Sequence, residues 1–103
     1  MPNTLRASLI VGALVVASAA LAQDRAKIGA GAEVYATRCA MCHGERLRAT
    51  GGAFDLLQLR PNERTRFDRV VNDGKGQMPA WGGLLSAEEI DQLWAYLRSR
   101  ADS

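Results

Sequence analysis

The feature that most constrains this chain is the stretch CAMCH at residues 39–43. Cys39 and Cys42 are its only cysteines, and His43 is its only histidine. A disulfide between the two thiols would not require the histidine. A thioredoxin-like dithiol normally accompanies a βαβ pattern, which the sequence lacks. A structural zinc site takes four ligands, whereas three are grouped here and no second ligand pair follows.

The remaining interpretation of CAMCH is covalent attachment of a c-type haem, for which C-x-x-C-H is the sequence signal. Two thiols separated by two residues lie within one helical turn, so each can form a thioether with one vinyl group of the macrocycle. The adjacent imidazole is then held under the iron. The sequence therefore predicts one haem c attached through Cys39 and Cys42, with His43 as an axial ligand.

Residues 1–22 have the order of a secretory signal peptide. Arg6 precedes an uncharged run over residues 7–22, which ends in Ala20-Leu21-Ala22 and is followed by polar residues. A retained membrane anchor is the alternative, but a span needs about 20 predominantly apolar residues, and this run is shorter and rich in alanine. We therefore expect cleavage after Ala22, a mature domain over residues 23–103 in the periplasm, and no stable membrane insertion.

The composition of the mature chain excludes some partners and requires a stabilising group. Without Arg6, twelve basic residues face eleven acidic ones, and no basic block long enough for nucleic acid appears. A domain of this size buries only about 60% of its unfolded surface and usually needs a disulfide, metal or cofactor. A haem would give the apolar side chains a common surface, and these are Tyr35, Phe54, Leu56, Leu59, Phe67, Val71, Leu84, Leu93 and Leu97.

The apolar spacing predicts an all-α chain of about three helices and loops, without a convincing strand. Ile28, Gly31, Ala32 and Tyr35 lie on one helical face that leads into CAMCH. A second helix is expected from about residue 62 to 73, ended by a glycine at position 74.

The third helix carries the clearest start signals. Ser86 and Glu89 have the spacing of a capping box, and Leu85 and Ile90 that of a hydrophobic staple. The helix is expected to end near Arg100.

A second axial ligand to iron must come from another side chain, because His43 is the sole imidazole. Met41 lies inside the attachment turn and should not reach the opposite face. Met78 lies in a loop rich in glycine and proline and is the better thioether, although core packing is the usual role of a methionine. Lys75 is a weaker candidate.

The chain resembles class I cytochromes c over nearly the whole mature sequence. The resemblance rests on Gly31 and Tyr35 before CAMCHG, on Met78-Pro79, and on the terminal LSAEEIDQLWAYLRS. It implies the cytochrome c fold around one covalent haem and favours Met78 as the second ligand. It also implies a close crossing of the first and last helices at Gly31, with Tyr35 packed beside it.

The sequence departs from this family at one point. The family usually has a proline some dozen residues after the histidine, and its carbonyl accepts the imidazole Nδ1 proton. Residues 44–60 contain no proline, so the acceptor in this chain is left open. Trp81 is a candidate donor to a haem propionate, or packs over the haem edge, and Arg60 is a weaker propionate candidate.

The leading functional hypothesis is a monomeric periplasmic one-electron carrier, not an enzyme, between a dehydrogenase and an oxidase or another cytochrome. Two alternatives stay open. The ending MPAWGGLLSAEEIDQLWAYL resembles the cytochrome portion of periplasmic quinoprotein dehydrogenases, which suggests a dedicated subunit. A five-coordinate ligand-binding or sensor cytochrome would result if Met78 does not bind the iron.

Overall fold

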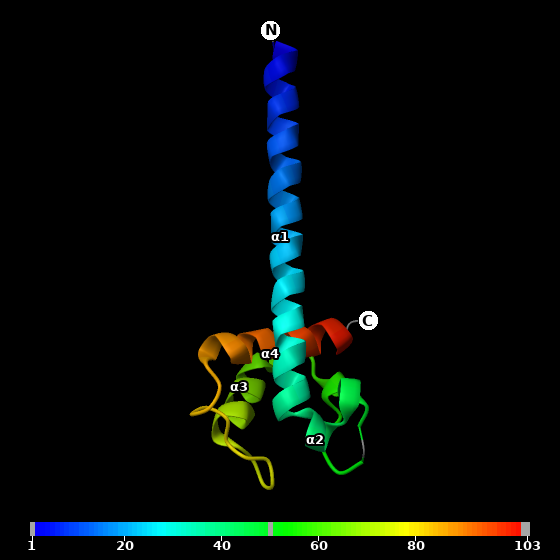
Figure 1. The fold of residues 1–103 in the computed structure, drawn as a ribbon, viewed down its shortest axis with the longest axis vertical. Coiled ribbons are helices and arrows are strands. Elements are labelled where there is room, and N and C mark those ends of the chain that lie inside the picture. Colours follow the sequence, from blue (N-terminus) through cyan, green and yellow to red (C-terminus); the bar gives the residue numbers. More distant parts are fainter. Residues whose placement is uncertain (1, 50, 102–103) are drawn as a thin grey trace.

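The computed structural model describes residues 2–49 and 51–101, and the regular structure of these residues is helical (Figure 1). Four α-helices span Pro2–Arg38 (α1), Ala40–His43 (α2), Arg64–Asp73 (α3) and Ala87–Ala101 (α4). Short 3-10 turns span Glu45–Leu47 (η1), Leu56–Gln58 (η2) and Pro61–Glu63 (η3). The predicted all-α class is confirmed, and the short α2 adds a fourth helix to the three expected.

Helix α1 is far longer than the other elements and projects from the rest of the chain, as Figure 1 shows. The helix predicted around residues 28–35 is confirmed, and it continues without a break through the expected cleavage point after Ala22. Residues 15–27 are exposed along it. Within the described ranges, no helix is both long and apolar enough to cross a bilayer.

Helices α1 and α4 cross at close range, which confirms the expected crossing at Gly31 (Figure 1). A Cβ atom on Gly31 would lie 1.9 Å from the carbonyl oxygen of Gln92, so this approach requires glycine. The rings of Tyr35 and Tyr96 pack beside the crossing, with centroids 5.5 Å apart. An ion pair between Lys27 and Asp91, 2.5 Å long, joins the two helices further along.

The capping box of α4 is present as predicted. The backbone N–H of Ser86 donates to Glu89 Oε1 at 3.0 Å, and the N–H of Glu89 donates to Ser86 Oγ at 3.1 Å. Leu85 and Ile90 are both buried, as a hydrophobic staple requires. The helix ends at Ala101, one residue beyond the expected end.

Helix α3 begins slightly later than the spacing predicted. Pro61 opens the 3-10 turn η3, and the α-helix starts at Arg64 rather than near residue 62. Gly74 ends the helix with φ of 76°, a left-handed conformation that glycine adopts without strain. The expected end is therefore confirmed.

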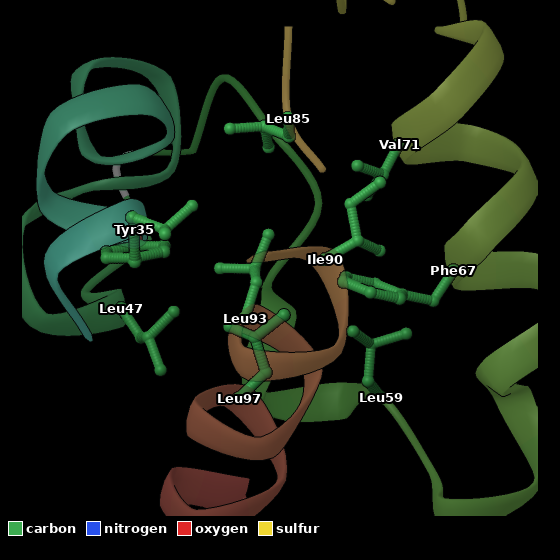
Figure 2. Packing of buried hydrophobic residues seen from close by; sticks show 10 residues of the cluster. Tyr35, Leu47, Leu59, Phe67, Val71, Leu85, Ile90, Leu93 and Leu97 are labelled. Carbon is green, nitrogen blue, oxygen red and sulfur yellow. The ribbon is translucent and has the colours of Figure 1, made fainter. Parts of the chain in front are cut away.

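The core gathers side chains from α1, α3, α4 and the connecting turns (Figure 2). Tyr35 and Leu47 lie on one side of Leu93 and Leu97 of α4, and Phe67 of α3 lies on the other. The full buried set is Val34, Tyr35, Leu47, Leu59, Phe67, Val71, Leu85, Ile90, Leu93 and Leu97. Of the side chains expected to meet a haem, Phe54 and Leu84 remain exposed to solvent.

Candidate haem site

The two cysteines lie on a helical turn that directly extends α1. The backbone N–H of Cys39 donates to Tyr35 O at 2.9 Å, and that of His43 donates to Cys39 O at 3.0 Å. Cys42 is exposed, whereas Cys39 is half-buried against the core. The rigid core therefore fixes the turn that carries both thiols and the imidazole.

The imidazole of His43 is oriented by a backbone carbonyl. Its Nδ1 lies 3.1 Å from the carbonyl oxygen of Phe54. A carbonyl can only accept, so Nδ1 carries the proton and donates. Nε2 is then the nitrogen with a lone pair available to a metal, and the acceptor that the sequence left open is Phe54.

The chain reverses sharply after the histidine. Gly44 has φ of 91°, and a Cβ atom there would lie 1.7 Å from Arg48 O. The Tyr35 hydroxyl donates to the Gly44 carbonyl at 2.5 Å, which ties the residue after His43 to α1. Leu47 has a positive φ of 67° and is buried, so its packing holds an otherwise unfavourable backbone conformation.

Burial, and secondarily the neighbouring Cys42, raises the pKa of the Cys39 thiol to about 11. The thiol is therefore neutral near pH 7. Reactive dithiols have lowered thiol pKa values, because the thiolate is the attacking species. This environment gives a second reason, beside the missing βαβ pattern, against a redox-active dithiol at CAMCH.

Met78 lies in the 74–82 loop, which backbone hydrogen bonds tie to the end of α3. Lys75 and Met78 exchange two bonds, of 3.0 and 2.9 Å, and the Trp81 N–H donates to Val71 O at 2.8 Å. A Cβ atom on Gly74 would lie 2.7 Å from Met78 O, so the glycine permits the loop to fold back closely. The backbone of Met78 is therefore well fixed.

The 74–82 loop lies beside the attachment turn. The guanidinium carbon of Arg38, the residue before Cys39, is 5.8 Å from the centroid of the Trp81 ring. Cys39, Met78 and Trp81 all pack against the same core cluster. Arg60 lies elsewhere on the surface, at the start of η3, where its backbone N–H donates to Glu63 Oε1 at 2.9 Å.

These donors fit a covalently attached haem. Two thiols share one turn, an imidazole has its Nδ1 held by a carbonyl so that Nε2 can bind a metal, and a thioether lies in a neighbouring loop. In the part of the chain that the structure describes, no three or more His, Cys, Asp or Glu side chains are grouped to hold a metal ion.

Comparison with known proteins supports the same assignment. Residues 26–97 match the family described as cytochrome c oxidase, cbb3-type, subunit III. Cytochrome c6 of Rippkaea orientalis is 33% identical, over 88% of this chain and 84% of its own length. The chain belongs to the class I cytochrome c family.

Two further relatives show the range of proteins that contain this domain. Cytochrome c-555 of Methylococcus capsulatus is 30% identical over 97% of the chain and 83% of its own length. Quinohemoprotein alcohol dehydrogenase ADH-IIG of Pseudomonas putida is 34% identical over 80% of the chain, which spans only 12% of that enzyme. No solved structure matches the chain significantly.

Membership of this family makes the protein an electron carrier with covalently bound haem c. Cys39 and Cys42 have the spacing of the attachment motif.

Sequence reasoning missed three contributors to the site of this cytochrome c: the Phe54 carbonyl, Arg38 and Arg66. A carbonyl is common to every residue, so no sequence pattern could select that of Phe54. Arg38 directly precedes the CAMCH motif, and only this position in the sequence could have indicated that it lies at the site. The guanidinium of Arg66 lies 5.3 Å from the Phe54 ring centroid, a contact between segments that only the fold brings together.

Tyr35 makes the stability of this cytochrome c sensitive to alkali. Burial is the main cause that raises the pKa of the Tyr35 hydroxyl from about 10 to about 12. The unfolded chain therefore loses this proton first. The stabilisation is complete below about pH 10 and is lost as pH rises through about 12.

We expect Tyr35→Phe to weaken the decrease in folding stability with rising alkaline pH. The same change lowers stability at neutral pH by about 1 kcal/mol, because the hydrogen bond of the hydroxyl is lost. Denaturant midpoints measured between about pH 8 and 11.5 test this. Tyr96→Phe is the matched control and should keep the steeper dependence. A Tyr35→Phe profile as steep as that of the wild type would contradict the assignment.

Proposed function

We propose that this cytochrome c is a periplasmic one-electron carrier whose haem iron is bound by His43 and Met78. The observation that carries the proposal is the hydrogen bond from His43 Nδ1 to the Phe54 carbonyl, because it leaves Nε2 for the iron. When bound, the haem supplies reversible ferric–ferrous chemistry. The protein supplies the thioether attachment at Cys39 and Cys42, the axial ligands and the surface that meets redox partners.

The rigid attachment of the 74–82 loop supports Met78 as the second ligand. A thioether binds iron weakly, so its position has to be fixed before it contributes useful affinity. The backbone bond from the Trp81 N–H to the Val71 carbonyl ties this loop to α3. The contact of Arg38 with the Trp81 ring holds it beside the attachment turn. With both axial positions occupied, electron transfer through the haem edge remains as the function.

Other residues take supporting roles in this proposal. Tyr35 fixes the turn after His43 through its bond to Gly44. Trp81 is placed beside Arg38, so an indole N–H and a guanidinium are together available to a haem propionate. Arg60, the residue before η3, is the weaker candidate for that role. Residues 1–22 act as the export signal, and cleavage after Ala22 releases a monomeric domain over 23–103.

Electrons would pass from a periplasmic dehydrogenase to an oxidase or to another cytochrome.

A second candidate function is that of a dedicated subunit of a quinoprotein dehydrogenase. It is favoured by the similarity to part of the quinohemoprotein alcohol dehydrogenase of Pseudomonas putida. Fixed-stoichiometry co-purification with a dehydrogenase from the native host would support the subunit, and isolation as a free monomer supports the carrier.

Replacing Met78 with alanine tests the axial ligation. We expect the ferrous variant to lose the low-spin spectrum and to bind carbon monoxide rapidly at neutral pH, because the position opposite His43 is then open. The reduction potential should fall, since a thioether ligand stabilises ferrous haem. Absorption spectra and potentiometry of the purified holoprotein provide both measurements.

Met41→Ala is the matched control, because Met41 lies in the attachment turn and its side chain is 96% exposed. It should leave the spectrum and the potential unchanged. A low-spin Met78→Ala spectrum would exclude Met78 as the ligand. Rapid carbon monoxide binding by the wild type would instead support the five-coordinate sensor.

A further inference from the structure

We infer that Arg66 is a positioning residue for His43 and acts through Phe54. The inference rests on the proposed function, in which His43 binds the iron. Two successive contacts carry the inference. The Phe54 carbonyl accepts from the His43 imidazole, and the ring of Phe54 in turn contacts the Arg66 guanidinium on α3.

Arg66 is itself held in place. Its Nη1 donates to Glu63 Oε2 at 2.7 Å, an ion pair one helical turn back along the chain. The backbone N–H of Arg60 and then the Arg66 guanidinium lower the pKa of the Glu63 carboxyl group. The carboxylate is therefore ionised at neutral pH and orients the guanidinium, which lies 5.3 Å from the centroid of the Phe54 ring.

The chain on the two sides of Phe54 is fixed to different degrees. On the carboxyl side, Asp55 Oδ1 accepts the Leu57 N–H at 3.0 Å and starts η2. The Leu59 carbonyl then accepts a bond from Arg98 of α4. On the amino side lie two exposed glycines, Gly51 and Gly52, which have no side chains to anchor the chain.

Phe54 therefore lies between an exposed pair of glycines and a turn that is fixed by hydrogen bonds. Its contact with Arg66 restrains the rotation of the residue whose carbonyl faces His43 Nδ1. The partner of the second ring nitrogen sets the orientation of a metal-bound histidine and the electron density that it donates. Loss of the Arg66 contact should let this carbonyl move away from the imidazole.

The test compares Arg66→Ala with Arg69→Ala in the haem-loaded protein, since Arg69 is exposed on the same helix. We expect the His43 Nδ1 proton, followed by NMR, to exchange about three- to fivefold faster in Arg66→Ala, as loss of an exposed cation–π contact predicts. The reduction potential should rise, because a less polarised imidazole stabilises ferric iron less. Arg69→Ala should resemble the wild type in both measurements.

A double-mutant cycle with Phe54→Leu separates this coupling from general destabilisation. Phe54→Leu keeps the carbonyl but removes the aromatic face, so adding Arg66→Ala to it should produce no further change in exchange or potential. Equal effects of Arg66→Ala in both backgrounds, or no effect in either, would overturn the inference. A wild type without a histidine-ligated low-spin spectrum would instead overturn the proposed function.

Discussion

Replacing Gly31 with alanine is expected to destabilise the holoprotein by about 3 kcal/mol. The added Cβ would lie 1.9 Å from the Gln92 carbonyl oxygen and 2.9 Å from the Tyr96 Cβ. The first of these atoms belongs to the backbone of α4, so the clash is relieved only if the two helices separate. Denaturant unfolding followed by far-UV circular dichroism gives the change in free energy.

Gly29→Ala is the matched control for this experiment. Gly29 lies two residues earlier on α1, and a Cβ there would have no heavy atom within 4 Å. Alanine at an open helical position should stabilise the protein by about 0.5–1 kcal/mol. The two substitutions are therefore expected to have opposite signs, and equal effects would show that the close crossing is not what requires Gly31.

Replacing both Cys39 and Cys42 with alanine is expected to abolish covalent haem attachment. The protein, expressed in a host competent in cytochrome maturation, should have the mass of the bare polypeptide and no haem stain on a denaturing gel. It should also lose cooperative thermal unfolding, because so small a chain then lacks its main apolar surface. Intact mass and thermal scans measure both effects.

Met41→Ala changes the same turn without removing a thiol, so it should retain the haem and the unfolding transition. Haem recovered at the wild-type level in the double cysteine variant would contradict attachment through these sulfurs. A haem-free chain that still unfolds cooperatively would contradict the proposed dependence of the fold on the cofactor.

Much of the scaffold could be predicted because its signals are local. The start of α4 depends on side chains three residues apart, and the bonds between Ser86 and Glu89 form as their spacing indicates. The end of α3 depends on one glycine with positive φ. The crossing at Gly31 was implied by resemblance, and the distance to Gln92 now supplies its physical reason.

The remaining features depend on atoms that every residue has, or on contacts between distant segments. The acceptor for His43 is the backbone carbonyl of Phe54. Because every residue has such a carbonyl, the sequence does not indicate which one accepts. The ion pair of Lys27 with Asp91 likewise joins segments that only the fold brings together. The positive φ of Leu47 is compensated by burial, which spacing alone does not reveal.

The tethering of the 74–82 loop has a consequence for how this protein can diversify. The bonds from Trp81 and Gly82 that hold the loop to α3, and the pair between Lys75 and Met78 inside the loop, involve main-chain atoms alone. The side chains of Gln77 and Ala80, which are exposed, take no part in these bonds. Partner recognition can therefore be altered by substitution at such positions while the backbone that carries Met78 stays constant.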